Sequence, residues 1–167
     1  MIDYYVNTDT GDNAYDGISA TFTGGTTGPK ASLAGAVALL GTLTDAVTIH
    51  CTGATADTAA VNLSTKGTDA VNALTIQVDA ADRHAGVWDD AKYRLLNTLN
   101  AGANYVTLVG LQVKHTNTGT SVQRVVSVTG VEAGGSAIVL DACLITGDYA
   151  ANTATAAGTP PTGAPIT

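Results

Sequence analysis

The chain has 167 residues, a net charge of −7, 45% hydrophobic residues and only 13% charged residues. Its seven basic residues are scattered, so they do not form the basic stripe that nucleic acids or anionic membrane surfaces require. No apolar run reaches the ~18 residues of a membrane-spanning helix, and the first residues lack the basic and apolar regions of a signal peptide. These features exclude nucleic-acid and membrane partners at the level of the sequence.

Residues 4–6 predict a short strand, and the polar, glycine-rich stretch that follows to residue 27 predicts a long loop. Three aspartates lie close together in this loop: Asp9, Asp12 and Asp16. Carboxylate and backbone oxygens are the ligands that calcium prefers, so the three residues are a candidate calcium site, although their spacing differs from that of an EF-hand. The alternative is that each aspartate stabilises a turn by accepting hydrogen bonds from the neighbouring backbone.

The next stretch predicts a helix over about residues 32–40. Ser32 is a suitable N-cap, and Pro29 stands shortly before the helical positions. The apolar residues recur at helical spacing on one face: Leu33, Ala36, Val37 and Leu40. Gly41 follows where a C-cap glycine belongs. We expect this helix to cover the open end of the strands that follow it.

After residue 41 the pattern changes to short stretches in which apolar and polar residues alternate. These predict strands at residues 46–51, 73–78, 93–96, 104–113, 122–128 and 137–145, separated by turns rich in Gly, Asn, Asp and Thr. Gly110 interrupts the alternation, so 104–113 is interpreted as two strand pieces joined by a tight corner. One such piece cannot bury its apolar row alone, which favours stacked coils.

The last stretch, residues 149–167, shows no periodicity and is rich in Pro and Gly, which predicts an extended tail or linker after a single domain at residues 1–148. Cys51 and Cys143 stand far apart in strand-like runs. We interpret them as small buried apolar residues, because two distant cysteines do not make a disulfide framework.

Two segments near the N-terminus, YYVNTDTGDNAYDG and GPKASLAGAVALL, resemble the start of right-handed parallel β-helix proteins of the pectate-lyase-like superfamily. Residues that stand in the same order as in those proteins are Asp16-Gly17, Pro29, Ser32 and Leu33. The later segments DAADRHAGVWDDAKYRLLN, NYVTLVGLQV and SAIVLDACLITGD resemble early coils of the same fold. The resemblance implies an all-β protein: a short right-handed parallel β-helix with an N-terminal capping helix and an extended C-terminal tail.

The superfamily includes polysaccharide lyases, glycoside hydrolases, bacterial surface proteins and phage virion proteins, so the resemblance alone does not fix an activity. Roughly four or five coils fit between Ala46 and Tyr149, fewer than the enzymes of this class use. We therefore expect a virion structural or adhesive module, such as a phage capsid decoration protein, head fibre or tailspike component. The alternatives are the N-terminal part of a lyase or hydrolase, or a bacterial surface adhesin.

The expected partners follow from this hypothesis: other virion proteins or copies of the chain itself, with a trimer implied by the resemblance, and a surface polysaccharide. The expected location is the virion, assembled in the host cytoplasm; the alternative is extracellular or on the cell surface. We expect no catalytic residue and no cofactor other than calcium, because the sequence lacks zinc-ligand spacing, a nucleophile elbow and a complete phosphate-binding loop.

One loop carries the candidate polysaccharide contacts: Arg83, His84, Trp88 and Asp89. An indole ring can stack on a sugar, and carboxylate, imidazole and guanidinium groups can bond its hydroxyls. The alternative is a purely structural loop in which Arg83 and Arg94 pair with neighbouring aspartates.

Overall fold

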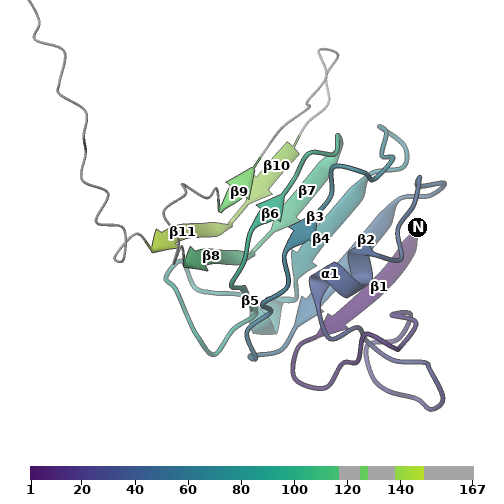
Figure 1. Ribbon diagram of the computed structural model, residues 1–167, viewed down its shortest axis with the longest axis horizontal. Coiled ribbons are helices and arrows are strands. Elements are labelled where there is room, and N and C mark those ends of the chain that lie inside the picture. Colours follow the sequence, from purple (N-terminus) through teal and green to yellow (C-terminus); the bar gives the residue numbers. More distant parts are fainter. Residues whose placement is uncertain (117–124, 128–137, 149–167) are drawn as a thin grey trace, which may run out of the picture.

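The computed structural model describes residues 1–116, 125–127 and 138–148, and these residues form mainly short β-strands (Figure 1). The strands are β1 (Ile2–Asn7), β2 (Val47–Thr52), β3 (Val61–Asn62), β4 (Leu74–Val78), β5 (Arg94–Leu95), β6 (Leu99–Asn100), β7 (Val106–Val109), β8 (Gln112–Thr116), β9 (Val126–Ser127), β10 (Ile138–Asp141) and β11 (Leu144–Asp148). The helical elements are α1 (Leu33–Val37) and a 3-10 helix (Ala80–Asp82). No described helix is long and apolar enough to cross a membrane. The predicted all-β class is confirmed.

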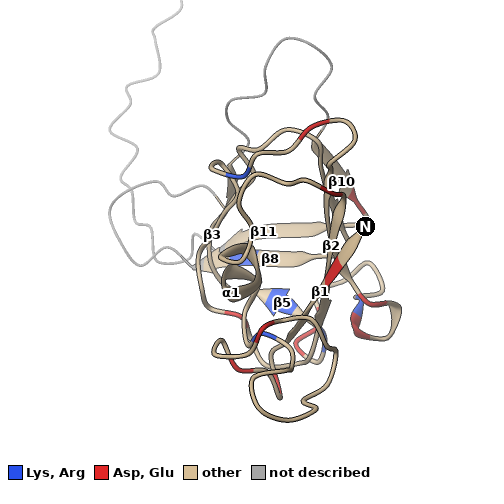
Figure 2. Ribbon diagram, turned by 90° about the vertical axis from the view of Figure 1, so that its right-hand side faces the viewer, with Lys and Arg blue, Asp and Glu red and all other residues tan. Residues whose placement is uncertain are grey.

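The strands pair in three parallel sheets. Sheet 1 has the order β1-β2-β4-β7-β10, sheet 2 the order β11-β8-β5, and sheet 3 the order β3-β6-β9. From β4 onward, consecutive strands belong to sheet 1, sheet 2 and sheet 3 in turn: β4, β5 and β6 are followed by β7, which pairs with β4 in sheet 1. In Figure 2, sheets 1 and 3 lie on opposite sides and the strands of sheet 2 run between them.

The alternation of side chains in sheet 1 places the core. Two in-register rows point into the interior and are at most 3% exposed: Val47, Leu74 and Val106, then Ile49, Ile76 and Leu108. The residues between them form an outward row that is only half-buried: Thr48, Thr75 and Thr107. Each fully buried Leu or Ile side chain contributes about 2 kcal/mol through removal of apolar surface from water, so these rows are a main source of stability.

Sheets 2 and 3 complete the interior with shorter strands. Leu95 and Val113 are in register and buried in sheet 2, and Val61 and Leu99 are in register and buried in sheet 3. The sequence did not predict β3 or β6, because two residues are too few to display an alternation. Of the strand predicted at 122–128, residues 125–127 fall within the described residues, and Val126 and Ser127 form β9. The tail predicted at 149–167 lies outside the described residues.

The helix is shorter than predicted. Ser32 is its N-cap, as expected, with Oγ accepting a hydrogen bond from the Gly35 N–H at 3.1 Å. The predicted end at residue 40 is wrong, because α1 stops at Val37 and the chain continues in tighter i→i−3 turns, in which Leu40 N–H donates to the Val37 carbonyl. Leu40 remains buried at 6% exposure, so its apolar character reports packing rather than helix length.

The N-terminal loop (residues 8–31) folds back on β1. Lys30 N–H donates to the Tyr5 carbonyl, and Asn7 N–H donates to the Lys30 carbonyl, at 2.8 and 2.9 Å. Tyr5 N–H donates to the Gly17 carbonyl at 2.8 Å. The loop therefore occupies the edge of β1 that faces away from β2.

The corner between β7 and β8 lies at Gly110, as the break in alternation predicted. Its φ of 69° is in the left-handed region, which favours glycine. A Cβ atom at this position would lie 2.5 Å from Nε of Arg83, so the side chain of Arg83 packs directly against the glycine backbone. The corner thus also positions the loop that carries Arg83.

Candidate functional site

The candidate site is the loop that joins β4 to β5, residues 79–93, and the outward side of β8 beneath it. Gln112 of β8 is fully buried and anchors this loop. Its Nε2 donates to the carbonyls of Asp89 and Tyr93 at 3.0 and 3.2 Å, and its Oε1 accepts a hydrogen bond from the Asp89 N–H at 2.7 Å. Three bonds to backbone groups hold the end of the loop on sheet 2.

Arg83 anchors the other end of the 79–93 loop. Its Nη2 and Nε donate to the Val78 carbonyl at 2.8 and 3.2 Å, and its side chain packs against Gly110. The guanidinium is therefore bonded to the backbone at the end of β4 rather than to an aspartate. Its role in the structure is to position the loop.

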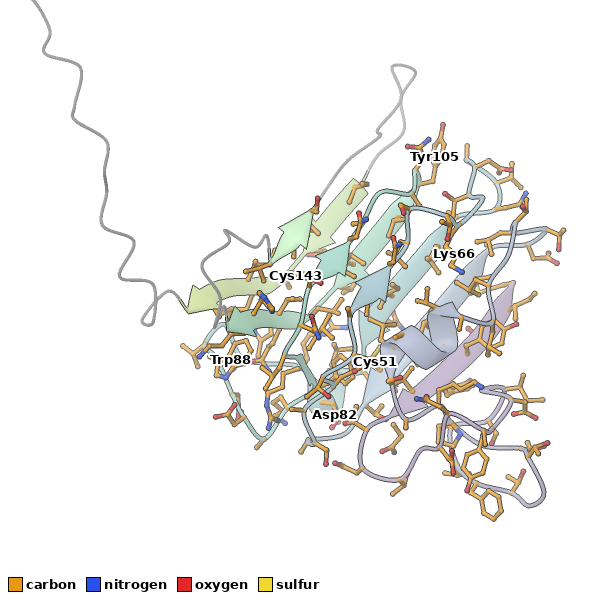
Figure 3. All side chains as sticks on the ribbon, viewed as in Figure 1. Cys51, Lys66, Asp82, Trp88, Tyr105 and Cys143 are labelled. Atoms are coloured by element: carbon orange, nitrogen blue, oxygen red, sulfur yellow. The ribbon has the colours of Figure 1, made fainter. Side chains whose placement is uncertain are left out.

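Trp88 lies at the edge of the molecule near β8 and is partly exposed (Figure 3). Its Nε1 donates to Oδ1 of Asp90 at 2.9 Å. Lys114 Nζ lies 5.9 Å from the centre of the indole ring, within the range of a cation–π contact. Arg94 Nε lies 3.2 Å from the same Asp90 oxygen, so the indole and the guanidinium are both close to one carboxylate.

The remaining predicted contacts are engaged within the loop. Nδ1 of His84 accepts a hydrogen bond from the Gly86 N–H at 3.0 Å, and Oδ1 of Asp89 accepts one from the Ala91 N–H at 2.9 Å. His84 Nε2 is buried and bonds to none of the described residues. Polar groups of all four predicted residues thus bond within the 79–93 loop or to the strands beside it, and the indole ring of Trp88 is partly exposed.

Sequence reasoning missed three residues of this site: Asp90 as the indole partner, Lys114 and Gln112. Lys114 stands at an outward position of β8, which the alternation of that strand could have indicated. Nothing local marks Gln112 as buried, because its partners come from a loop about twenty residues earlier in the chain. The pairing of Arg94 with Asp90 agrees with the structural alternative considered for this loop.

The predicted calcium ligands each have hydrogen-bond donors close by. Asp9 accepts bonds from the Thr55 hydroxyl at 2.6 Å and from the Ala54 and Thr55 N–H groups at 2.9 and 2.8 Å, and these bonds lower the pKa of its carboxyl group. Asp12 accepts a bond from the Ala14 N–H at 2.8 Å. Asp9 therefore ties the N-terminal loop to the turn that follows β2.

Asp16 bonds to the backbone at a third place. It accepts hydrogen bonds from the N–H groups of Ile18 and Gly28 at 3.1 and 3.4 Å. Desolvation acts to raise the pKa of Asp16, but these and other hydrogen bonds outweigh it, and the pKa is lowered.

Within residues 1–116, 125–127 and 138–148, no three His, Cys, Asp or Glu side chains converge as a metal ion requires. The calcium site stays a prediction.

A second group of polar side chains is buried beneath α1. Asp57 is 3% exposed, and its Oδ2 accepts hydrogen bonds from the Leu33 N–H at 2.6 Å and from the Tyr93 hydroxyl at 3.0 Å. Its Oδ1 accepts a third bond from the Ala59 N–H at 3.1 Å. Burial raises the pKa of Asp57 despite these bonds, and it also raises the pKa of the Cys51 thiol nearby. This group joins the first turn of α1 to the sheets.

The two cysteines are both free. Cys51 is fully buried, as interpreted from the sequence, whereas Cys143 is only partly buried.

Comparisons with known protein families, curated proteins and solved structures find no match to this chain. The resemblance to pectate-lyase-like proteins therefore stays a prediction.

Proposed function

We propose that the chain folds as a short right-handed parallel β-helix with α1 as its N-terminal cap. The repeated passage through sheets 1, 2 and 3 supports this fold, and right-handed crossovers are the rule for parallel strands. The capping role is supported by the burial of the apolar face of α1 against β1, β2 and β3, with Leu33 and Ala36 at 0% exposure.

We further propose that this β-helix is a structural and adhesive module of a virion, such as a capsid decoration protein, head fibre or tailspike component. The resemblance of its N-terminal segments to such proteins supports the class. The observation that carries the adhesive role is Trp88, a partly exposed indole on a loop held by the buried Gln112. A loop that is already ordered loses little entropy on binding, and an aromatic face suits the apolar face of a sugar ring.

Binding to surface polysaccharides tests this proposal. The wild-type protein is expected to bind at least one member of a panel of immobilised O-antigen and capsular polysaccharides in surface plasmon resonance. The substitution Trp88→Ala is expected to weaken that binding about tenfold or more, because it removes the stacking surface. The neighbouring Val87→Ala is the matched control, since Val87 is also apolar and 67% exposed and is expected to bind as wild type does.

Two results would count against this function. If the wild-type protein binds no polysaccharide of the panel, the adhesive role fails; if Trp88→Ala binds as tightly as wild type, the site is misplaced. Cleavage of a bound polysaccharide into smaller oligosaccharides would favour the alternative of a lyase or hydrolase.

The proposed assembly role rests on β10 and β11, which are edge strands of sheets 1 and 2. Leu140 of β10 and Ile145 of β11 align with the buried Leu108 and Val113, yet they are 44% and 43% exposed. Inward-facing apolar side chains of this kind are normally covered, and we propose that another virion protein or another copy of the chain covers them.

Light scattering tests the assembly role. The wild-type protein is expected to have the mass of a small oligomer, three copies if the resemblance holds, and Leu140→Lys is expected to reduce it to a single copy. The control is Val139→Lys, which changes a neighbouring residue of the same exposure (43%) that points to the other face of β10 and is expected to keep the oligomer. A wild-type monomer, or equal effects of the two substitutions, would contradict self-assembly through this surface.

A further inference from the structure

The N-terminal end of sheet 1 carries apolar side chains that α1 leaves uncovered. Ile2 of β1 is in register with Val47, which is buried and faces inward. Tyr4 stands in the same relation to the buried Ile49, so Ile2 and Tyr4 both point to the inward side of the sheet. Yet Ile2 is 37% exposed, and Tyr4 is only partly buried. α1 and β1 lie toward the viewer in Figure 2.

A hollow of about 130 Å³ lies beside these two side chains. Its opposite wall is formed by residues 39–45, which connect α1 to β2 and include the partly exposed Leu39 and Asp45. Leu39 and Tyr4 also flank Gly17 of the N-terminal loop, because a Cβ atom at Gly17 would lie 3.1 and 3.4 Å from their side chains. Pockets that enclose small molecules are larger, about 300–1,000 Å³, so this hollow suits a side chain of a larger partner.

The backbone of β1 is open beside this hollow. On the edge away from β2, the N–H groups of Tyr5 and Asn7 donate to carbonyls of the N-terminal loop. Every second residue of a strand directs its backbone groups to the same edge, so the N–H and carbonyl of Asp3 face that edge as well. Among the described residues, no backbone group bonds to Asp3 on this side. β1 therefore offers unpaired backbone groups at Asp3 to an added strand.

Two exposed carboxylates lie at this end of the sheet. Asp45 belongs to the wall of the hollow, and its side chain is 58% exposed. Asp3 follows Ile2 and points to the outward face of β1, with its side chain 42% exposed. The basic groups closest to them are the N-terminal ammonium, 3.8 Å from Oδ1 of Asp45, and His50, whose Nε2 lies 3.3 Å from Oδ1 of Asp3. Solvent weakens both contacts, so the two carboxylates favour a partner that carries positive charge.

We propose that this end of β1 docks an extended segment of another protein in which apolar and basic residues alternate. The segment adds beside Asp3 as a short strand and pairs with its free backbone groups. Because the side chains of a strand alternate between two faces, the apolar side chains of the segment enter the hollow on the inward side. Its basic side chains then lie on the outward side near Asp3, and Asp45 adds to their attraction.

A second copy of the chain does not fit this description. Among its described strands, only β5 and β8 contain Lys or Arg, namely Arg94 and Lys114. β8 is paired on both sides, with β5 and β11, and β5 has only two residues. The partner is therefore a different protein. The surface is also separate from Trp88 and from β10 and β11, so the inference does not depend on the function proposed above.

Two short peptides test this docking by NMR titration. The probe is acetyl-Lys-Val-Lys-Val-Lys-amide, and its counterpart has glutamate in place of each lysine. The lysine peptide is expected to bind with a dissociation constant of about 1 mM or lower, about fivefold more tightly than the glutamate peptide. Its binding is expected to shift the amide signals of residues 2–4 and 39–45. Exchange of the Asp3 N–H with solvent is expected to slow about tenfold at saturation, because this group then donates to the peptide.

Asp45→Asn is expected to weaken binding of the lysine peptide about threefold, because it removes one of the two negative charges. The matched control is Asp141→Asn, which removes an exposed aspartate of β10 at the opposite edge of sheet 1 and is expected to bind as wild type does. The proposal is overturned if the lysine peptide does not bind, if the glutamate peptide binds as tightly, or if the Asp3 N–H exchanges as fast with the peptide as without it. Protection of the β10 amides in place of Asp3 would also overturn it, because the peptide would then extend the other edge of the sheet.

Discussion

Replacing Asp57 with alanine is expected to lower the free energy of unfolding by about 3 kcal/mol or more. The substitution leaves the Leu33 N–H, the Tyr93 hydroxyl and the Ala59 N–H without the acceptor they share in a buried site. It also detaches the first turn of α1 from the sheets. Urea denaturation followed by the fluorescence of the single tryptophan measures the change.

Two further substitutions provide a smaller expected loss of stability and a control for Asp57→Ala. Tyr93→Phe removes one of the three donors and is expected to cost about 1 kcal/mol. Asp45→Ala removes an aspartate whose side chain is 58% exposed and whose distance to the N-terminal ammonium is 3.8 Å, and its effect is expected to be small. Equal losses for Asp57→Ala and Asp45→Ala would show that the buried carboxylate does not hold α1.

The pH dependence of the Asp57 effect has a defined sign. Because burial raises its pKa in the folded state, the native protein binds this proton more tightly than the unfolded chain does. The resulting stability is fully present below the unfolded pKa of about 3.9 and is lost as the pH rises through the folded value. The Asp57→Asn side chain does not titrate. The difference in free energy of unfolding between wild type and Asp57→Asn is therefore expected to become smaller as the pH rises through the folded-state pKa of Asp57.

The second large effect is expected from Gln112→Ala. It removes all three bonds that fasten the 79–93 loop to β8 and empties a fully buried site, at a cost of about 2 kcal/mol or more. Polysaccharide binding is expected to fall as well, because Trp88 loses its fixed position. Urea denaturation and surface plasmon resonance on the same preparation measure both changes.

The control for Gln112→Ala is Thr107→Ala, on the outward face of β7. Thr107 is half-buried, and no hydrogen bond among the described residues joins it to the 79–93 loop. The loss in free energy of unfolding is therefore expected to stay below about 1 kcal/mol, the range of strand propensities. If Gln112→Ala weakens stability but leaves polysaccharide binding unchanged, the anchored loop is structural only.

The longer strands could be predicted from sequence because each carries enough residues for the alternation to be visible. Val47, Ile49 and Cys51 were placed on one side of their strand, and all three are buried. Gly110 and Ser32 were also predictable, since a left-handed corner and a helix N-cap each demand a narrow choice of residue.

The features that escaped prediction depend on contacts between distant segments. The short strands β3 and β6 exist because neighbouring strands supply their hydrogen bonds, and α1 ends early because the chain tightens into i→i−3 turns. Gln112 and Asp57 are polar residues in buried places, which only their distant partners explain. For the candidate site, sequence reasoning named Trp88 as a contact, which stays a prediction, and did not name the residues that fix its position.

The contact of the N-terminal loop with β1 has a consequence for aggregation. An unpaired edge strand is a template for strands of other molecules, but along Tyr5–Asn7 the backbone groups on that edge already bond to Gly17 and Lys30. Among the described strands of sheet 1, β10 forms the opposite edge. The N-terminal loop thus closes the Tyr5–Asn7 part of the β1 edge to strands of other molecules.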